Sequence, residues 1–228
     1  MLEFGPMLDI IGNGIYVMQA YTAVHGLFLV VLAFRRIAQK RFASVAASDE
    51  FLAKAAEPLQ KQDYEAAVAV CDSPPYWAKA TPQLLLLAIQ KRDLPPVPLR
   101  EFVGEKFERD VLADMDYRMA WINTLVKTAP MLGLLGTVIG MISAFAKIAS
   151  RSRTGVDPSA LASDISFALF TTAIGLMIAI PLVVAGSAIQ VRMSRLQDSV
   201  QEQMGWLLGL LEQNRVNANK SSSPRSNV

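Results

Sequence analysis

Four threonines bring hydroxyl groups into the two longest uncharged runs in the second half of the chain. Thr128 and Thr137 lie in the run 128–146, and Thr171 and Thr172 lie in the run 165–191; neither run contains Asp, Glu, Lys or Arg. A threonine hydroxyl in a helix can donate to the backbone carbonyl one turn earlier, which satisfies it without any further role. The same hydroxyls can instead line a narrow polar path and order water. Both interpretations remain open from the residues, and under the second we take Thr137, Thr171 and Thr172 as the candidates for an ion path.

Ionisable side chains are rare in these runs. Asp164 directly precedes the run 165–191, where a carboxylate either stabilises the first turns of a helix or serves as an acid at the outer mouth of a path. His25, the only histidine, lies in a third run, 10–34, and is either a functional group or a neutral histidine bonded to a neighbouring helix. The sequence contains no paired carboxylates inside the runs, no Ser/His/Asp set, no phosphate-binding loop and one cysteine. We therefore expect no enzyme, no metal site and no cofactor.

Glycine recurs at helical spacing in the runs 128–146 and 165–191. Small residues along one stripe let helix backbones approach closely in lipid, where no hydrophobic effect drives association. The glycines that we expect to pack in this way are Gly133, Gly136, Gly140 and Gly175. Pro130 and Pro181 each free the carbonyl four residues earlier from its helix hydrogen bond. Freed carbonyls favour a bundle interior or a wet cavity over a lipid-facing surface.

The three uncharged runs predict three transmembrane helices. A span needs about 20 apolar residues. The runs 10–34 and 165–191 exceed this length, and the run 128–146 is one residue shorter. The composition agrees, since 52% of the residues are hydrophobic and 18% are charged. The net charge of +2, without a basic patch that alternates with aromatics, gives no reason to expect nucleic acid. We expect an all-α integral membrane protein that contacts the lipid bilayer.

The basic residues beside the runs predict the orientation of the chain. None precedes the first run, whereas RRIAQKR (35–41) follows it, and Arg192 and Arg195 follow the third. Because basic flanks favour the cytoplasmic side, we expect a periplasmic N-terminus and a cytoplasmic C-terminus. The loop 147–158 places three basic residues outside in this orientation. The reverse orientation would place 35–41 outside instead, which is worse.

Apolar residues at helical spacing extend two spans into the cytoplasm as long helices. The stripe before the second span runs over 112–129, and the stripe after the third runs over 193–211. Asp157 as N-cap and Pro158 in the first turn are typical of the start of the last helix, which we expect to reach about Asn214.

The remaining cytoplasmic residues read as short helices with breaks. Residues 43–98 contain helical stretches separated by a turn at 73–77 and end in a stop at 93–98. The expected organisation is a periplasmic N-terminus (1–9), a first span (10–34), a cytoplasmic helical region (35–127), a second span (128–146), a periplasmic loop with the start of the third helix (147–164), a third span (165–191), a cytoplasmic amphipathic helix (192–217) and a disordered tail (218–228).

Two stretches resemble a known family when they are taken together. TAPMLGLLGTVIGM (128–141), followed by ISFALFTTAIGLMIAIPLVV (165–184), resembles the paired signature of the MotA/TolQ/ExbB proton channel family. Three spans with an outer N-terminus are similar to the TolQ/ExbB branch, whereas MotA has four spans. The resemblance is strong over 110–192 and looser over 1–109.

The resemblance implies a homo-pentamer of this chain in the bacterial inner membrane, around two helices of an ExbD/TolR-like partner. In that family the single membrane aspartate of the partner carries the proton, and the proton motive force drives rotation or force that reaches the periplasm. Thr137 and Thr172 match the threonines of the family's second and third spans, and Pro130 and Pro181 match its prolines. The implied function is that of a proton-channel and stator subunit of a molecular motor.

One position departs from the family pattern. ExbB and TolQ proteins typically have a glutamate where this chain has Phe167, and the nearest acid is Asp164. We therefore expect a divergent branch, with Asp164 as the candidate acid at the outer mouth. The competing hypothesis is a non-conducting pentameric scaffold that only holds the partner helices. The channel hypothesis requires the hydroxyls of Thr137 and Thr172, whereas the scaffold requires only the glycine stripe.

Overall fold

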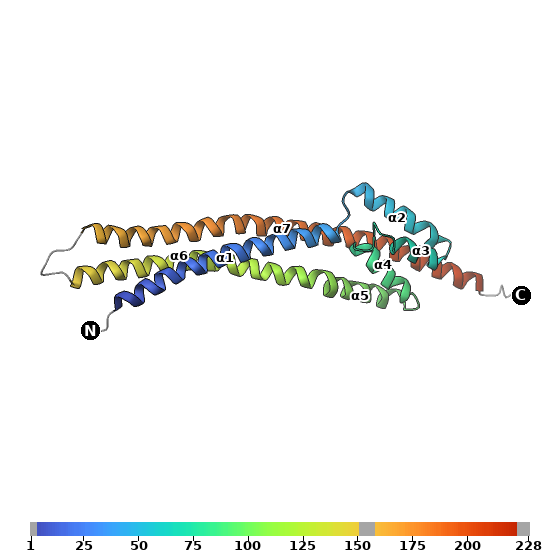
Figure 1. The fold of residues 1–228 in the computed structure, drawn as a ribbon. Coiled ribbons are helices and arrows are strands. Elements are labelled where there is room, and N and C mark those ends of the chain that lie inside the picture. The colour runs from blue at the N-terminus through green and yellow to red at the C-terminus, as the bar shows by residue number, and fades with distance from the viewer. Residues whose placement is uncertain (1–3, 151–157, 223–228) are drawn as a thin grey trace, which may run out of the picture. The chain divides into compact units, whose positions relative to one another are not determined.

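The computed structural model describes residues 4–150 and 158–222, and every regular element in these ranges is a helix (Figure 1). The expectation of an all-α protein is thus confirmed. In chain order the helices are α1 (Phe4–Lys40), α2 (Val45–Gln60), α3 (Tyr64–Cys71), α4 (Ala80–Gln90), α5 (Pro96–Phe107), the π-helix η1 (Glu108–Leu112), α6 (Ala113–Ser150) and α7 (Pro158–Ser222).

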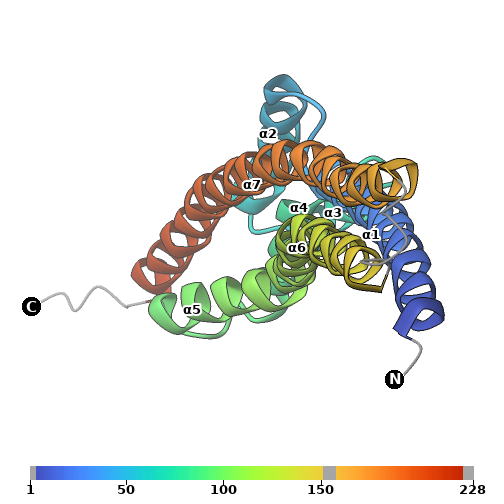
Figure 2. The same ribbon diagram turned by 90° about the vertical axis from the view of Figure 1, so that its left-hand side faces the viewer.

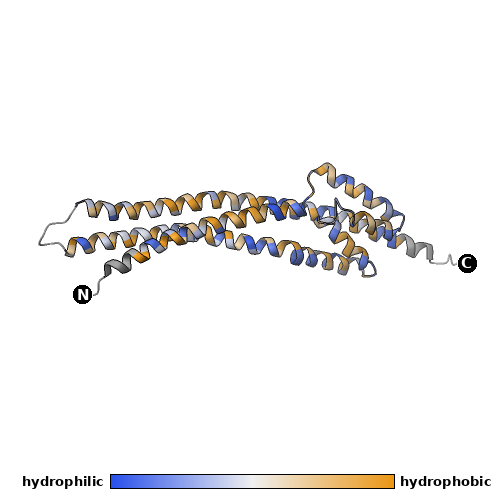
Figure 3. Cartoon of the chain, in the orientation of Figure 1, coloured by the Kyte–Doolittle hydropathy of each residue, from blue (hydrophilic) through white to orange (hydrophobic). Residues whose placement is uncertain are grey.

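Three helical stretches among the described residues are long and apolar enough to cross a membrane. They cover Ile10–Lys40, Pro96–Ala149 and Pro158–Val216, and each contains one of the predicted spans. Figure 3 shows the apolar residues along α1, α6 and α7. Large apolar side chains such as Val17 and Leu134 stay more than 60% exposed, which suits lipid rather than water. The chain is accordingly a multi-pass membrane protein.

The described residues form two compact units. The apolar unit comprises 4–33 together with the described residues of 118–190, and the second unit comprises 34–117 and 191–222. Within the apolar unit, α1, α6 and α7 lie side by side (Figures 1 and 2). Each of these helices contacts the other two. Gln19 of α1 donates a hydrogen bond to α7, His25 of α1 lies edge-on to Trp121 of α6, and glycines bring α6 and α7 into contact.

The second unit packs short helices against the C-terminal half of α7. The side chains of Ser44 and Asp63 accept hydrogen bonds at the starts of α2 and α3 and act as N-caps. Gln203 of α7 is buried and lies in a hydrogen-bonded network. Its amide nitrogen donates to Ser48 (2.7 Å) and Ser199 (2.8 Å), and its oxygen accepts from Thr81 (2.5 Å). One amide therefore connects α7 to α2 and α4.

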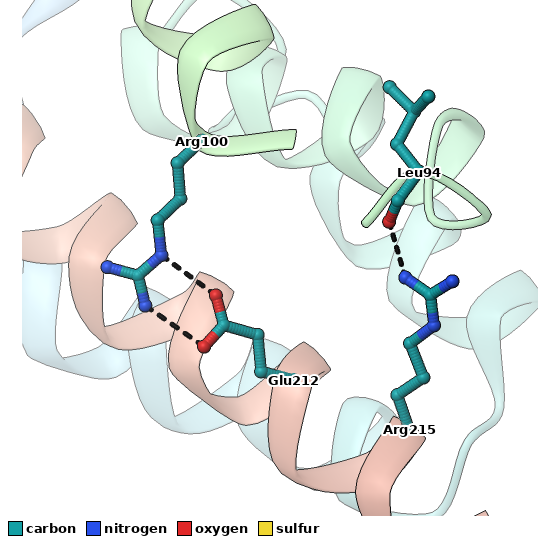
Figure 4. Close-up of polar contacts among 4 residues, drawn as sticks. All are labelled: Leu94, Arg100, Glu212 and Arg215. Carbon is teal, nitrogen blue, oxygen red and sulfur yellow. Dashed lines mark hydrogen bonds and ion pairs between the residues drawn. The ribbon is translucent and has the colours of Figure 1, made fainter. Parts of the chain in front are cut away.

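Two arginines form polar contacts between the end of α7 and the region of α5 within the second unit (Figure 4). Arg100 of α5 donates from Nε and Nη2 to the two carboxylate oxygens of Glu212 at 2.8 and 3.1 Å. Arg215 donates to the backbone carbonyls of Leu94 and Asp93 in the turn before α5. The end of α7 is thus held by both α5 and the turn that precedes it.

The boundaries of two helices differ from the expectation. Helix α7 begins at Pro158 as expected, while the predicted N-cap Asp157 lies outside the described residues. It runs to Ser222, past Asn214 and into the segment 218–228 that we expected to be disordered; residues 223–228 lie outside the described part. Helix α5 begins at Pro96, inside the predicted stop 93–98. A proline suits the first turn of a helix, where its missing N–H has no intrahelical partner.

The two predicted stripes are buried along long helices. In α7, Leu196, Val200, Met204, Leu207 and Leu211 are all buried, and Met193 is half-buried. The stripe before the second span is buried at Leu112, Met115, Met119, Ile122 and Ala129, and Leu125 is buried where the helical spacing places the half-buried Val126. The π-helix η1 joins α5 to α6, so the helical run before the second span starts at Pro96 rather than near Leu112.

The Gln203 network predicts a specific loss of stability in the second unit. Gln203→Ala removes one partner from three buried or half-buried hydroxyls, which costs about 1–3 kcal/mol when polar groups lose their bonds. Exposure of the Cys71 thiol during unfolding provides the measurement, because burial and the charge of Asp72 raise the pKa of this buried thiol to about 12 and keep it unreactive in the folded unit. We expect Cys71 to become reactive at a lower temperature in Gln203→Ala. Gln201→Ala, on the exposed face of the same helix, is the control and leaves the transition unchanged. Equal transitions in the two variants would contradict the structural role of the network.

Candidate functional site

Glycines allow the backbones of α6 and α7 to touch. A Cβ atom added to Gly136 would lie 2.6 Å from Thr171 Cβ, and one added to Gly175 would lie 2.6 Å from the carbonyl oxygen of Ala129. A Cβ at Gly133 would lie 2.9 Å from the Cα of Thr172. Atoms cannot approach so closely, so no residue larger than glycine fits without moving the helices. Gly140 makes the same kind of contact with Ala168.

The hydroxyls of Thr137 and Thr172 meet across this close contact. Their Oγ1 atoms lie 3.2 Å apart, one on α6 and the other on α7. Thr137 donates within its helix to the carbonyl of Leu134 (2.8 Å), and Thr172 donates across to the carbonyl of Gly133 (3.0 Å). Both side chains are half-buried. The pair therefore forms a small, partly exposed polar spot within the apolar unit.

Thr171 has a different environment from its neighbour Thr172. It is fully buried, and its hydroxyl donates to the carbonyl of Ala168 at 2.9 Å. Its own carbonyl accepts from Nε2 of Gln19 on α1 at 2.7 Å. Successive residues of a helix point about 100° apart, which explains why only Thr172 joins Thr137. Thr171 therefore lies inside the subunit, between α1 and α6. Its role in lining an ion path stays a prediction.

Asp164 lies in a polar cluster at the start of α7. Its Oδ1 atom is 2.7 Å from Nζ of Lys147, and its Oδ2 atom accepts a hydrogen bond from Ser143 at 3.3 Å. The side chain of Asp164 is 14% exposed and that of Lys147 is 44% exposed. A hollow of about 380 Å³ opens beside the carboxylate and is also lined by Asn13 and Phe167. The carboxylate of Asp164 is therefore paired with a basic residue of α6.

Phe167, which lines the same hollow, packs against α1. Its ring lies edge-on to Tyr16, with centroids 5.4 Å apart, and a Cβ added to Gly12 would lie 3.1 Å from its Cζ atom. The missing side chain of Gly12 thus leaves room for the phenylalanine ring. The position that the family resemblance associates with glutamate is occupied here by a contact between α1 and α7.

The remaining candidates do not join the threonine pair. His25 is half-buried between aromatic rings, stacked on Tyr21 (5.4 Å) and edge-on to Trp121 (6.3 Å). Both prolines lie inside continuous helices. Because Gly175 lies against Ala129, the antiparallel register separates Pro130 from Pro181 by more than one helical turn. The carbonyls that they free belong to Val126 and Met177, four residues before each proline, and these lie within about one residue of the same level in this register.

Sequence reasoning missed Gln19 and the partners of Asp164. Gln19 is 1% exposed, and its Oε1 atom has no hydrogen-bond partner among the described residues. A signal for it exists, because Gln19 and Asn13 are the only amide side chains in the run 10–34. The bond to Thr171 requires two residues 152 positions apart to meet, which no local pattern predicts. Within the described ranges, no three metal-binding side chains come together.

Comparison with known proteins places the site in a family context. The model described as "MotA/TolQ/ExbB proton channel family" matches residues 80–202, more than half of the chain. "Biopolymer transport protein exbB1" of Vibrio cholerae serotype O1 is 35% identical over 86 residues, which cover 36% of this chain and 37% of that protein. "Biopolymer transport protein ExbB" of Xanthomonas campestris pv. campestris is 45% identical over 88 residues, which cover 37% of this chain and 34% of that protein. "Putative biopolymer transport protein ExbB-like 3" of Synechocystis sp. is 28% identical over 126 residues, covering 55% and 53% of the two chains. The chain thus spans about half or less of the length of these curated relatives.

The contact between Gly136 and Thr171 predicts the effect of a single added methyl group. Gly136→Ala places a Cβ where Thr171 already lies, and overpacking of this kind costs about 1–3 kcal/mol. Thermal unfolding of the purified protein in lipid nanodiscs should shift to lower temperature. Gly14→Ala is the matched control, because a Cβ at Gly14 has no neighbour within 4 Å. The same unfolding temperature in both variants would show that α6 and α7 do not depend on this contact.

Proposed function

The chain belongs to the MotA/TolQ/ExbB proton channel family, and we propose on this premise that it is a proton-channel and stator subunit. In this proposal it couples the proton motive force to work in the periplasm or at the outer membrane, as the transport names of its relatives suggest. It acts as part of a channel complex and not as an enzyme. The observation that carries the proposal is the pair of half-buried hydroxyls on Thr137 and Thr172, 3.2 Å apart on two apolar helices.

Hydrogen-bond accounting explains what this pair can offer. A hydroxyl has one hydrogen to donate and two lone pairs that accept. The hydroxyls of Thr137 and Thr172 can donate to the carbonyls of Leu134 and Gly133, or one of them can donate to the other. The two oxygens therefore have lone pairs to accept a hydrogen bond from a protonated carboxylic acid. When that acid loses its proton, rotation of either hydroxyl turns an acceptor into a donor for the carboxylate.

The acid in this scheme comes from a partner. We propose an ExbD/TolR-like protein with one membrane span and an aspartate in that span, which five copies of this chain surround. The supporting feature is that the described spans hold a polar acceptor pair without a carboxylate beside it. The complex would lie in the bacterial inner membrane with the N-terminus in the periplasm. Arg35, Arg192 and Arg195, which follow the first and third spans, support this orientation.

The hydroxyl pair separates the channel from a non-conducting scaffold. Thr137→Val together with Thr172→Val keeps the size of both side chains and removes both hydroxyls. Loss of hydrogen bonds to an ionisable group costs about 1.5–3 kcal/mol each, so proton influx should fall by about tenfold or more. The measurement is a pH-sensitive reporter in cells that also produce the co-purifying single-span partner, with the amount of complex quantified in parallel.

A second double variant is the control for the loss of threonine hydroxyls as such. Thr124 and Thr128 donate to the carbonyls of Ala120 and Thr124 in their own helix, at 2.9 and 2.8 Å. Thr124→Val with Thr128→Val should leave proton influx unchanged. Normal influx in the Thr137/Thr172 variant would instead favour the scaffold.

We further propose that Asp164 is the acid at the outer mouth, with Lys147 as its counter-ion. Asp164→Asn removes the carboxylate that lies 2.7 Å from Lys147, whereas Asp164→Glu keeps a charge that can reach it. Proton influx should therefore be lower in Asp164→Asn than in Asp164→Glu. If both variants conduct like the parent protein, Asp164 has no role at the mouth.

A further inference from the structure

The turn 73–79 in the second unit presents one tryptophan outward. Trp77 is 64% exposed. Its neighbour Tyr76 turns inward and packs on Phe51 and Phe42, with ring centroids 5.0 and 6.2 Å apart. Phe51 is completely buried. The turn therefore has an inner side fixed in the core of the unit and an outer side that carries the indole ring.

Hydrogen bonds hold this turn in one conformation. The Ser73 hydroxyl donates to the carbonyl of Val70 (2.7 Å), and the backbone N–H of Trp77 donates to the carbonyl of Ser73 (3.1 Å). The side chain of Gln83 donates to the carbonyl of Trp77 at 2.8 Å. A large aromatic side chain is thus held outside on a rigid support, which lowers the entropy that is lost when it binds a surface.

The turn is attached to the end of α1. Nζ of Lys79 donates to the carbonyl of Ala38 in the last turn of this helix (3.4 Å) and to that of Arg41, the residue directly after the helix (2.7 Å). Ala38 comes four residues after Phe34, the end of the uncharged run, or about 6 Å along a helix. The headgroup layer on each side of a bilayer is about 5–8 Å thick. The two carbonyls therefore lie about 6 and 10 Å beyond Phe34, at headgroup level and just outside it, when the run 10–34 spans the hydrocarbon core.

The side chains around Trp77 match the chemistry of that layer. Tryptophan is enriched where a membrane meets water, because its ring is apolar and its N–H is polar. Arg35, which is exposed, lines an open hollow of about 450 Å³ together with Trp77, Pro74 and Pro75. A basic side chain at this depth can keep its apolar stem near lipid and its charge near phosphates.

We propose that the turn 73–79 docks on the headgroup layer of the membrane that α1 enters, with Trp77 seated at the lipid–water interface. The docked turn would fix the second unit to the membrane surface through a contact other than the spans themselves. This inference is independent of proton conduction, since it uses only the exposed tryptophan, its rigid support and its attachment to α1. A neighbouring copy of the chain is the competing occupant, and the test below separates the two.

Single-tryptophan forms of the full chain provide the test. Trp121→Phe with Trp206→Phe leaves only Trp77, and Trp77→Phe with Trp121→Phe leaves only Trp206. Trp206 is the matched control, because it lies in the same unit, is 47% exposed, and comes 15 residues after Val191, about 22 Å along the helix from the end of the third run. Each form is placed in lipid nanodiscs whose phospholipids carry bromine near the top of the acyl chains, and in unbrominated nanodiscs of the same composition.

The expected result is a loss of most Trp77 emission in the brominated nanodiscs, with a blue-shifted maximum in the unbrominated ones, and unchanged emission of Trp206. Bromine quenches only at contact distance, so this loss reports the indole in the lipid. Equal, weak quenching of both tryptophans, with strong quenching of Trp77 by aqueous acrylamide, would place Trp77 in water and overturn the proposal. Protection of Trp77 from both bromine and acrylamide would assign the surface to a contact with another protein copy, which also overturns it.

Discussion

The close approach of α6 and α7 at Gly136 and Thr171 determines the rest of the apolar unit. Lipid supplies no hydrophobic force between helices, so their association depends on packing at short range. A glycine at position 136 lets the backbone of α6 approach to the point where only Thr171 fits beneath it. The same approach brings Thr137 within 3.2 Å of Thr172. A wider separation between the helices would break the hydrogen bond from Thr172 to the carbonyl of Gly133. Each hydroxyl could then bond only within its own helix.

Polar groups in the apolar unit are placed where the backbone can satisfy them. Unbonded donors and acceptors are costly in lipid, and the hydroxyls of Thr137, Thr171 and Thr172 all donate to carbonyls. The difference between them lies in exposure, since Thr171 is buried and the other two are half-buried. Because their hydroxyl groups can donate to backbone carbonyls, the three threonines are tolerated inside apolar helices. The partial exposure of the Thr137 and Thr172 side chains is the feature on which the proposed contact with a partner acid rests.

The second unit depends on a different set of forces. Its helices are short, and hydrophobic contacts alone permit neighbouring registers. Buried amides restrict this freedom, because Gln203 bonds to α2 and α4 and Asn214 donates to the carbonyl of Leu59 at 2.5 Å. The pair of Arg100 with Glu212 adds a fixed distance between α5 and α7. We infer that these polar contacts specify the arrangement, while the apolar core supplies most of the stability.

The sequence by itself determined the class of protein, the three spans, the long helices and the residues most worth testing. These features follow from the composition and from the spacing of apolar residues along the chain. Both are local properties, because a helix in lipid must be long and apolar whatever it packs against. The family resemblance already singled out Thr172 beside Thr137, whereas only the tertiary structure decided that Thr171 is buried, that Asp164 is paired with Lys147, and that Phe167 lies against Gly12. The spacing of residues along a helix determines which of them share a face. The register between two helices determines which residues of the neighbouring helix that face contacts. That register depends on contacts between distant segments, as the bond between Gln19 and Thr171 illustrates.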